Sequence, residues 1–160
     1  MNAAHINPFI SSALTVFETM LGVKLARGQL YLKAASEVSL EVSAIIGLSG
    51  KARGTVVLSM SQQTAMAIAE VLLGEKTEGM SPATIDAIGE VTNMVAGGAK
   101  AQLEQFDMRM TIPTVIVGHD VRIEFPSKVP PLCIPFESPW GRLSIEVGLV
   151  EQGAEAAVPA

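Results

Sequence analysis

Residues 39–60 read SLEVSAIIGLSGKARGTVVLSM and contain two runs in which apolar and polar side chains alternate. The first run, Leu40–Leu48, has an apolar residue at every second position, and Ser49-Gly50 interrupts it before the second run, Thr55–Met60. A period of two places the apolar side chains on one face of a strand. Two such strands around a Ser-Gly turn predict an antiparallel hairpin with one buried face.

Helical segments are predicted on both sides of this hairpin, each starting at a polar capping residue. Proline suits the first helical position, and glycine suits the position just past the last turn. The predicted helices are a first from Asn7-Pro8 to Gly22, a second from Ser61 to Gly74, and a third from Ser81-Pro82 to about Phe106.

The remaining apolar runs predict further strands, so the chain reads helix, strands, helix, then helix, strands. The two halves share this pseudo-two-fold layout but not a sequence. An antiparallel or mixed sheet with helices on one face is the natural packing, and a second copy of the chain would cover the other face or a free edge. We expect an α+β fold with one domain over residues 1–150 and a loose tail over 151–160. The further strands are predicted at 29–32, 110–117, 121–125, 132–136 and 143–149, with a turn at 138–141.

The composition of the chain excludes some classes of function. Of its 160 residues, 49% are hydrophobic and 17% are charged, which suits a packed core and argues against disorder. The net charge is −5 and the basic residues are scattered, so no nucleic-acid-binding surface is expected. The basic residues of the first third are expected on solvated faces of strands: Lys24, Arg27, Lys33, Lys51 and Arg53.

Neither a secretion signal nor a membrane-spanning run is visible, so we expect a cytoplasmic protein without a membrane partner. The single cysteine, Cys133, allows no intramolecular disulfide and is expected to be a buried, inert thiol. His5 in a frayed start and His119 in a turn are interpreted as loop residues, because their spacing offers no convergent metal ligands. Trp140 in its turn is expected to cap the core rather than to anchor an interface, which is the alternative.

The third predicted helix carries the informative surface, over residues 86–100. At roughly 100° per residue, Glu90 and Asn93 project to nearly the opposite side from the core stripe. They are three residues apart, so their side chains are neighbours on the outer face. The expected core stripe is Ile85, Ile88, Thr92, Val95, Ala99 and Leu103, and the expected partner-binding residues around Glu90 and Asn93 are Asp86, Met94, Gly97 and Ala101.

Three residues on or near this outer face are poor helix formers. The amide of Asn93 competes for backbone hydrogen bonds, and Gly97 and Gly98 each cost about 1 kcal/mol relative to alanine. Close approach by the backbone of a partner would offset that loss, and Met94 would add an adaptable apolar contact. The alternative is a solvated helix face with a glycine pair packed against the sheet.

The residues around Glu90 and Asn93 resemble a known family. The segment GEVTNMVAGGAK (89–100) is similar to the Glu-x-x-Asn helix of the CheC/CheX/FliY phosphatases of bacterial chemotaxis. The similarity extends from Asn7 to Leu149 and is greatest to the CheX branch. Each matching segment alone is weak, but the segments together form a specific match. Four other segments carry it: NPFI (7–10), VFETMLG (16–22), IPTVIVG (112–118) and IPFESPWG (134–141).

The resemblance implies a CheC/CheX-like two-layer fold and an activity. Members of this family dephosphorylate CheY, a response regulator that carries a phosphoryl group on an aspartate. By resemblance, Asn93 is the amide that orients the attacking water, and Glu90 is the acid that pairs with a lysine of the regulator. The regulator is expected to bind the Mg2+, and this chain is expected to have no metal site or cofactor of its own.

The resemblance also implies one active face per chain and a homodimer paired through the sheet. CheC relatives carry two Glu-x-x-Asn motifs, but here the first helix reads Glu18-Thr19-Met20-Leu21, with leucine in place of the amide. Two alternatives stay open: a non-catalytic module that docks a receiver domain or a flagellar-switch component, and a purely structural dimerisation domain. The presence of both Glu90 and Asn93 favours the phosphatase.

Overall fold

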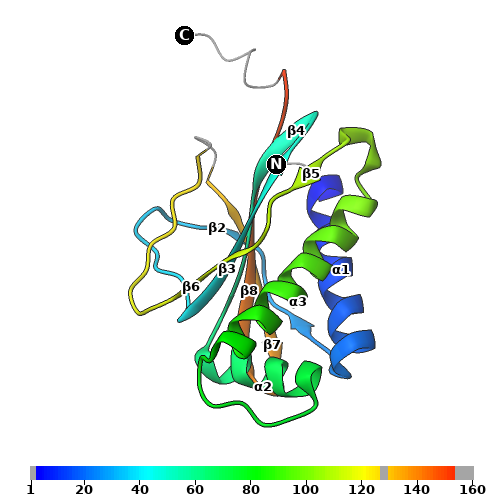
Figure 1. Ribbon diagram of the computed structural model, residues 1–160. Helices are drawn as coiled ribbons and strands as arrows, with labels where there is room; N and C mark the ends of the chain where they lie inside the picture. Colours follow the sequence, from blue (N-terminus) through cyan, green and yellow to red (C-terminus); the bar gives the residue numbers. More distant parts are fainter. Residues whose placement is uncertain (1–2, 127–129, 154–160) are drawn as a thin grey trace.

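The computed structural model of the protein describes residues 3–126 and 130–153 (Figure 1). The helices are α1 (Ala3–Leu21), α2 (Gln62–Leu73), α3 (Pro82–Ala101) and the short 3-10 helix η1 (Glu104–Phe106). The strands are β1 (Ala26–Arg27), β2 (Tyr31–Leu32), β3 (Val42–Ser49), β4 (Ala52–Met60), β5 (Arg109–Met110), β6 (Thr114–Val117), β7 (Leu132–Ser138) and β8 (Gly141–Glu151).

The strands of the described residues form one eight-stranded sheet in the order β1-β7-β8-β4-β3-β5, with β2 on β7 and β6 on β3. Each of these pairings is antiparallel. β3 and β4 form the predicted hairpin, with Val42 opposite Met60 and Leu48 opposite Gly54. The expected antiparallel or mixed sheet is therefore confirmed in its antiparallel form.

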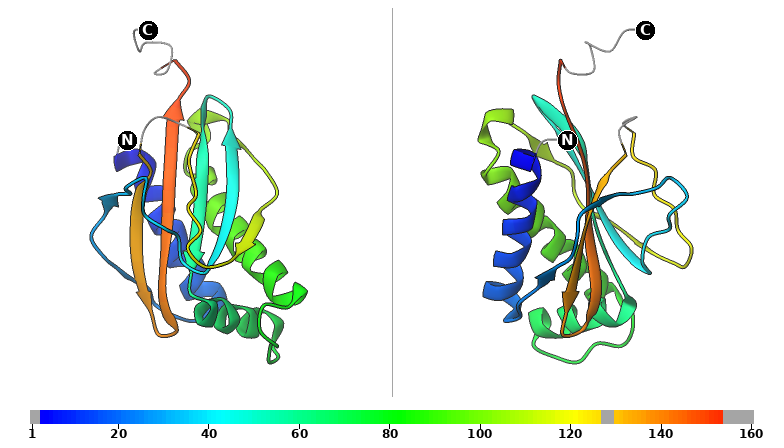
Figure 2. Two further views of the ribbon diagram at one scale, coloured as in Figure 1. Left: turned by 90° about the vertical axis from the view of Figure 1, so that its left-hand side faces the viewer. Right: turned by 180° about the vertical axis from the view of Figure 1, so that it is seen from behind.

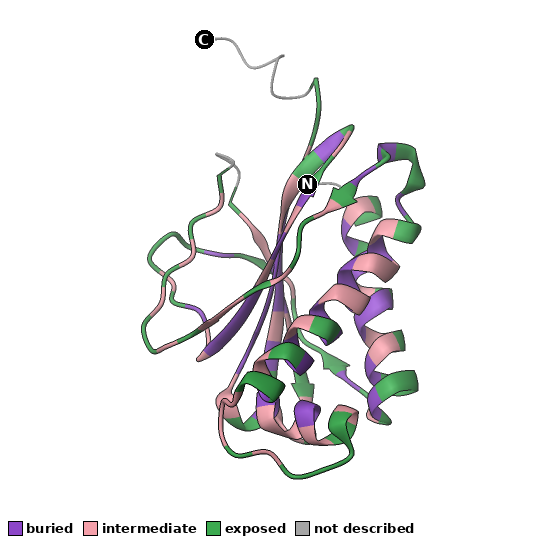
Figure 3. Cartoon of the chain, viewed as in Figure 1, coloured by how far each residue is buried: buried purple, intermediate pink, exposed green. Residues whose placement is uncertain are grey.

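The helices lie on one face of this sheet. α1 and α3 run side by side across that face, and α2 follows directly on the end of β4 (Figure 1 and Figure 2). The surfaces that face each other between the two layers are buried (Figure 3). The two-layer α+β fold is confirmed, and its core includes Phe9 and Phe17 of α1, Ile88 of α3, Ile46 of β3 and Ile145 of β8.

The opposite face of the sheet is covered in large part by connections of the same chain. Residues 33–41, between β2 and β3, and residues 118–126, which follow β6, pass over it (Figure 2). Ser39 of the first segment is buried, and its backbone N–H donates to the carbonyl of Val121 in the second segment (2.8 Å). The ring of Phe125 lies 2.8 Å from the position that a Cβ on Gly148 would take. These contacts provide part of the cover that the sequence analysis assigned to a second copy.

The first helix starts earlier than predicted. α1 begins at Ala3, so Asn7 is not its cap and Pro8 lies inside the helix. The burial of Ile6 explains the difference, because this side chain extends the apolar stripe of α1 toward the N-terminus and packs in the core. Gly22, with φ 70°, ends the helix as predicted.

The other two helices begin at their predicted caps. The hydroxyls of Ser61 and Ser81 each accept a hydrogen bond from the backbone N–H three residues later, at 3.2 and 3.3 Å. Gly74 ends α2 in the left-handed conformation, also as predicted. The third helix is shorter than expected, since α3 stops at Ala101 and η1 occupies the end of the predicted span.

Several strand predictions need correction. Residues 121–125 form no strand, because this alternating run crosses the open face of the sheet instead of pairing along it. The run 110–117 is divided between β5 and β6, for a reason given below. The expected tail does not begin at Glu151, which pairs with Ala52 at the end of β8. Residues 154–160 of that tail lie outside the described residues.

The expectation of solvated basic residues is wrong for Lys33. This side chain is buried, and its ammonium lies 2.6 Å from the carboxylate of Glu146 and 3.1 Å from the hydroxyl of Ser39. The carboxylate is 113 positions away in the sequence, so no local pattern reveals the pair. The other four basic residues of the group are exposed, and two of them, Arg27 and Arg53, lie on strands as predicted.

The prediction that His5 lies in a frayed segment is wrong, because this residue belongs to α1. Its ring packs edge-on against Phe106, with centroids 5.0 Å apart, and its Nε2 lies 3.2 Å from Glu151 Oε1. Trp140 is half-buried against the core, which confirms the prediction for this residue. In the parts of the chain that the structure describes, no helix combines the length and the apolar character that a membrane crossing needs.

Candidate functional site

One side of α3 packs in the core, and the other side borders solvent. The polar member of the core side, Thr92, donates its hydroxyl hydrogen to the carbonyl of Ile88 (2.7 Å). Ile85 departs from the predicted core stripe, since it is half-buried and lines a groove on the outer side. The buried members of the predicted stripe are Ile88, Thr92, Val95, Ala99 and Leu103.

The adjacent glycines Gly97 and Gly98 of α3 have different surroundings. A Cβ on Gly98 would collide with the hydroxyl of Ser12, so this glycine permits the close approach of α1. Ser12 is buried and donates to the carbonyl of Val95 across the helix pair (2.6 Å). A Cβ on Gly97 would have the methyl carbon of Met110 as its nearest neighbour, at 3.9 Å, which is an ordinary contact. Gly98 therefore packs against α1 rather than against the sheet, and Gly97 keeps its place on the outer side.

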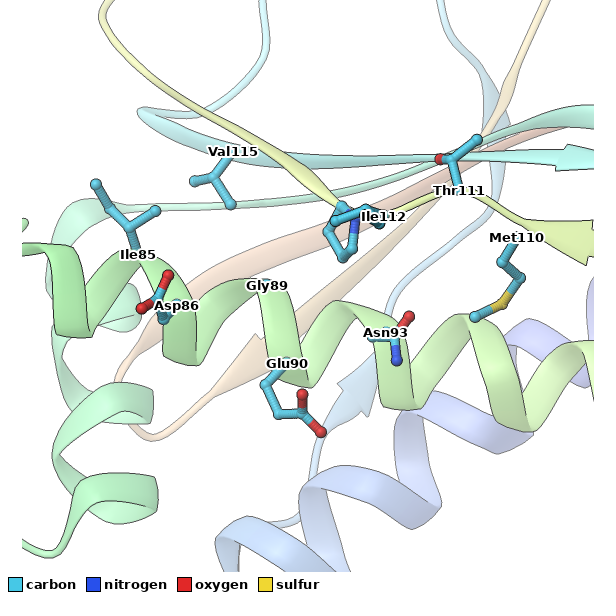
Figure 4. A pocket seen from close by; sticks show the side chains of 10 residues that line it. Ile85, Asp86, Gly89, Glu90, Asn93, Met110, Thr111, Ile112 and Val115 are labelled. Carbon is cyan, nitrogen blue, oxygen red and sulfur yellow. The ribbon is translucent and has the colours of Figure 1, made fainter.

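Glu90 and Asn93 lie next to each other on the outer side of α3 (Figure 4). Glu90 is exposed, and Asn93 is half-buried. Within residues 3–126 and 130–153, neither side chain takes part in a hydrogen bond or an ion pair. The fold therefore leaves both polar groups available to another molecule.

A groove of about 510 Å³ runs between α3 and the segment that joins β5 to β6 (Figure 4). The helix contributes most of the polar groups, and the facing segment is mainly apolar. Asn93 lies on the helix wall of the groove (Figure 4). The residues that line the groove are Ile85, Asp86, Gly89, Glu90 and Asn93 from α3, Thr111, Ile112 and Pro113 from the facing segment, and Met110 and Val115 from the adjoining strands β5 and β6.

The facing segment contains a one-residue bulge. β5 pairs with β3 where Met110 lies opposite Leu48, and β6 pairs with β3 where Thr114 lies opposite Ile45. From 48 to 45 is three steps along β3, but from 110 to 114 is four steps along its partner. An unequal count leaves one residue unpaired and turns its side chain away from the ladder. This bulge is the reason why the predicted strand 110–117 is divided.

Hydrogen bonds place the extra residue after Thr111. The N–H of Thr111 donates to the carbonyl of Gly47 (2.9 Å), and its hydroxyl accepts from the N–H of Gly47 (2.8 Å). A Cβ on Gly47 would come within 3.1 Å of the Thr111 methyl carbon, so a small residue suits this close contact. The chain then leaves the ladder at Ile112-Pro113, and Ile112 is 88% exposed.

The groove is acidic on its helix side. Asp86 and Glu90 stand four residues apart on α3, where two like charges destabilise a helix by about 0.2–0.5 kcal/mol. No Lys or Arg lines the groove, and neither carboxylate forms an ion pair in the described part of the chain. A cation from another molecule would relieve this repulsion, so the site suits a basic group.

The other predicted partner-binding residues fall into two groups. Asp86 is exposed and lines the groove together with Glu90. Met94 is half-buried against the core, Gly97 is half-buried and Ala101 is exposed, and these three do not line the groove. The sequence analysis missed the facing segment altogether, because a bulge in strand register brings it to α3. The one local sign of it is an apolar residue before a proline at Ile112-Pro113.

The first helix offers no second site of this kind. Glu18 is exposed, but Leu21, which stands where the amide would be, is buried. In the described ranges, no group of three or more His, Cys, Asp or Glu side chains is placed to hold a metal ion. The candidate chemistry of this chain therefore rests on the face of α3.

A second pocket, of about 220 Å³, lies under the segment that joins β2 to β3. Cys133 lines it and is buried as expected, and burial raises the pKa of its thiol. Burial also raises the pKa of the Glu146 carboxyl, although the ammonium of Lys33 acts in the opposite direction. Tyr31 closes the pocket through a hydrogen bond from its hydroxyl to Glu37 Oε1 (2.6 Å). These groups fasten the β2–β3 segment to the sheet.

Comparison with known proteins shows the family of the chain. Residues 42–137, more than half of the chain, match the family model described as chemotaxis phosphatase CheX. The CheY-P phosphatase CheX of Thermotoga maritima is 28% identical over 127 residues, which cover 78% of this chain and 82% of the relative.

Solved structures agree with this assignment. The chemotaxis protein CheX from Vibrio vulnificus is 32% identical, with a TM-score of 0.85 over 92% of this chain and 100% of that chain. The CheX chain in the CheX-CheY-BeF3-Mg+2 complex from Borrelia burgdorferi is 26% identical, with a TM-score of 0.79 over 92% of this chain and 98% of that chain. The protein therefore belongs to the chemotaxis phosphatase CheX family.

Proposed function

We propose that this protein removes the phosphoryl group from the aspartyl-phosphate of a CheY-type response regulator. The relative from Thermotoga maritima is named a CheY-P phosphatase, and the relative from Borrelia burgdorferi was solved in complex with CheY, BeF3 and Mg2+. One observation carries the proposal: an unengaged amide, Asn93, and an unengaged carboxylate, Glu90, share one open helix face. The fold gains little from this arrangement, whereas catalysis by positioning depends on it.

Asn93 would orient the water that attacks phosphorus. Hydrolysis of an acyl phosphate demands mainly positioning and charge stabilisation. A neutral amide approaches an anionic phosphoryl group without repulsion, its oxygen accepts a hydrogen bond from the water, and its NH2 group donates. The water oxygen forms the new P–O bond, the aspartate leaves as a carboxylate, and inorganic phosphate is released. The half-buried place of Asn93 on a rigid helix limits its freedom, which favours such alignment.

Glu90 would anchor a lysine of the regulator. A carboxylate close to the phosphoryl group would repel it, so this acid is better used on a cation beside the reacting atoms. The exposure of Glu90 and the adjacent acid Asp86 support that role, because both carboxylates lack a cation of their own. The regulator would supply the phosphorylated aspartate and the Mg2+, which neutralises developing charge when it is bound.

The proposal is tested by following the loss of aspartyl-phosphate from a purified receiver domain, with and without this protein. The wild type should accelerate the loss, and Asn93→Ala should reduce the acceleration by about 100-fold, the scale of a lost positioning group. Gln63→Ala removes an exposed amide on α2 outside the groove, so this control should keep wild-type activity. Melting temperatures of both variants should stay close to the wild type.

A non-catalytic docking module is the second candidate, which the free acids of the groove support equally well. It predicts that the protein binds the receiver without shortening the lifetime of the aspartyl-phosphate. Binding with an unchanged lifetime would therefore replace the phosphatase by the docking module. If the receiver does not bind at all, a structural dimerisation domain remains.

A further inference from the structure

Ile112 is the most exposed large hydrophobic side chain of the described residues, at 88%. A lone exposed hydrophobic residue is common on protein surfaces and needs no functional explanation by itself. Two features distinguish Ile112. Its backbone is held firmly on both sides, and it stands at the mouth of the groove that contains Glu90 and Asn93 (Figure 4).

The backbone around Ile112 is fixed by its two neighbours. Thr111 makes two hydrogen bonds to Gly47, one through its N–H and one through its hydroxyl. Pro113 has a fixed φ, biases Ile112 toward an extended conformation, and lies 3.9 Å from the position of a Cβ on Gly89 of α3. The bulge then turns the Ile112 side chain off the ladder. The backbone at Ile112 therefore loses little conformational freedom on binding, and this favours affinity.

The two walls of the groove offer different chemistry to an occupant. On α3, Asp86 and Glu90 present negative charge without a cation. On the facing segment, Ile112 and Pro113 present apolar surface. The matching occupant is a protein surface that has a basic side chain next to an apolar patch. An acidic surface or a nucleic acid would meet like charge here.

We propose that Ile112 is the apolar anchor with which the groove recognises the receiver domain of its substrate. The receiver would direct a cation to Asp86 and Glu90, and an apolar patch beside its phosphorylation pocket would cover Ile112. This inference rests on the proposed function, because it assigns the groove to a phosphorylated receiver. Ile112 touches no reacting atom in this arrangement, so it determines substrate affinity and leaves the chemical step to Asn93.

A receiver loaded with Mg2+ and BeF3 separates this inference from the proposed function, because that complex does not turn over. By titration calorimetry, Ile112→Ala should raise the Kd about tenfold, the scale of an interface anchor. Ile112→Leu keeps the apolar volume and should stay within about threefold of the wild type. Val71→Ala removes an exposed β-branched side chain on α2 outside the groove, and this control should leave the Kd unchanged.

Kinetics and salt dependence supply readouts that a structural defect would not reproduce. With phosphorylated receiver, Ile112→Ala should raise KM by the same factor as the Kd and keep kcat within about twofold. Added salt should weaken the binding of wild type and Ile112→Ala with equal slopes, whereas Asp86→Asn should flatten the slope.

The outcomes distinguish the two proposals. If Ile112→Ala keeps the wild-type melting temperature and also the wild-type Kd, the anchor is rejected even where phosphatase activity is intact. A fall in kcat with unchanged KM rejects it as well. If the wild type binds the loaded receiver but shows no turnover, while Ile112→Ala weakens that binding, the phosphatase is rejected and the anchor stands.

Discussion

Glu90 and Asn93 differ in charge, and this difference decides what each can do. The neutral amide tolerates contact with a phosphoryl group, and the carboxylate suits a cation beside it. Neither side chain has a partner within the described part of the chain, so their replacement is expected to change function and to leave stability nearly untouched. Replacement of Lys33 or Glu146 is expected to lower stability and to leave function nearly unchanged. These two residues are buried, pair with each other and hold the β2–β3 segment.

Replacing Glu90 by Gln keeps the shape of the side chain and removes its charge. We expect KM for the phosphorylated receiver to rise about fivefold while kcat changes less than about twofold, since a rim charge acts mainly on association. The salt dependence of KM should shrink at the same time. Steady-state kinetics at two ionic strengths measure both effects. A lower kcat at unchanged KM would instead assign Glu90 to the chemical step.

Replacing Lys33 by Met would leave the carboxylate of Glu146 buried without a cation. We expect the free energy of unfolding at neutral pH to fall by about 3–5 kcal/mol, the usual cost of breaking a buried ion pair. Urea unfolding measures this change. The double variant Lys33→Met, Glu146→Gln removes the uncompensated charge and should recover most of the loss. If it recovers nothing, lost packing of the lysine stem explains the effect.

The same variant gives a pH prediction. Burial raises the pKa of Glu146 above its ordinary 4.5, and Lys33 opposes this, so removal of Lys33 should raise the pKa further. A carboxyl with a raised pKa in the folded state stabilises the fold below the unfolded pKa, and this stabilisation is lost as pH rises through the folded pKa. The penalty of Lys33→Met should therefore be small near pH 4.5 and grow toward pH 7. A constant penalty over that range would contradict the raised pKa.

At the scale of elements, the sequence predicts best what depends on neighbouring residues. The β3–β4 hairpin follows from its alternation, and α2 and α3 start at their serine caps because those hydrogen bonds span three residues. The run 121–125 misleads because its alternation serves contacts over the open sheet face. The start of α1 depends on whether Ile6 finds space in the core, which only the assembled layers decide.

The residues of the candidate site also differ in how far the sequence predicts them. Helical spacing makes Glu90 and Asn93 neighbours, and the resemblance of the surrounding residues to the Glu-x-x-Asn helix singles out this pair. Ile112 is not predictable, because its position follows from the register of two short strands on β3. The pairing of Lys33 with Glu146 is equally hidden, since it joins a loop to a strand 113 positions later. Spacing along one element is visible in the sequence, whereas contact between elements is not.

The glycine pair of α3 gives a matched test of helix packing. Gly98→Ala would push its methyl group into Ser12 and separate α1 from α3, so we expect a loss of about 1–3 kcal/mol in unfolding free energy. Gly97→Ala meets only an ordinary contact, so it should gain up to about 1 kcal/mol from helix propensity. Chemical denaturation of both variants measures the difference. If Gly98→Ala stabilised the protein as much as Gly97→Ala, the structure around Ser12 would have to shift at little cost to accommodate the added methyl group.

At the scale of the whole molecule, the sheet has two different edges. The β3 side carries β5 and β6, and their connection forms one wall of the groove. The β7 side carries the two short strands β1 and β2, where Tyr31 is 41% and Leu32 is 63% exposed. An edge of unpaired backbone groups with exposed apolar side chains invites pairing with another chain. The groove and a dimer contact can therefore occupy opposite edges.

We expect the protein to sediment as a homodimer that pairs through the β1–β2 edge. Leu32→Asp should shift the sedimenting mass to that of one chain, because it places a charge in the apolar contact. Receiver binding per chain should remain, since the groove lies at the other edge. A control change on α2, Val71→Asp, should leave the mass unchanged. Wild type that sediments as a single chain at micromolar concentration contradicts the dimer.

The unequal step count between β3 and its neighbour has an evolutionary consequence. Deleting a single residue from 111–113 would make the two counts equal, so β5 and β6 would fuse into one uninterrupted strand. Ile112 would no longer project at the mouth of the groove, while α3 and the amide of Asn93 would stay in place. If Ile112 and Asn93 have the proposed roles, deletion of one codon would change the apolar contact with the partner without altering the helix that holds the amide. Under the proposed roles, the apolar contact with the partner and the water-orienting amide lie in separate segments, so each could diverge independently.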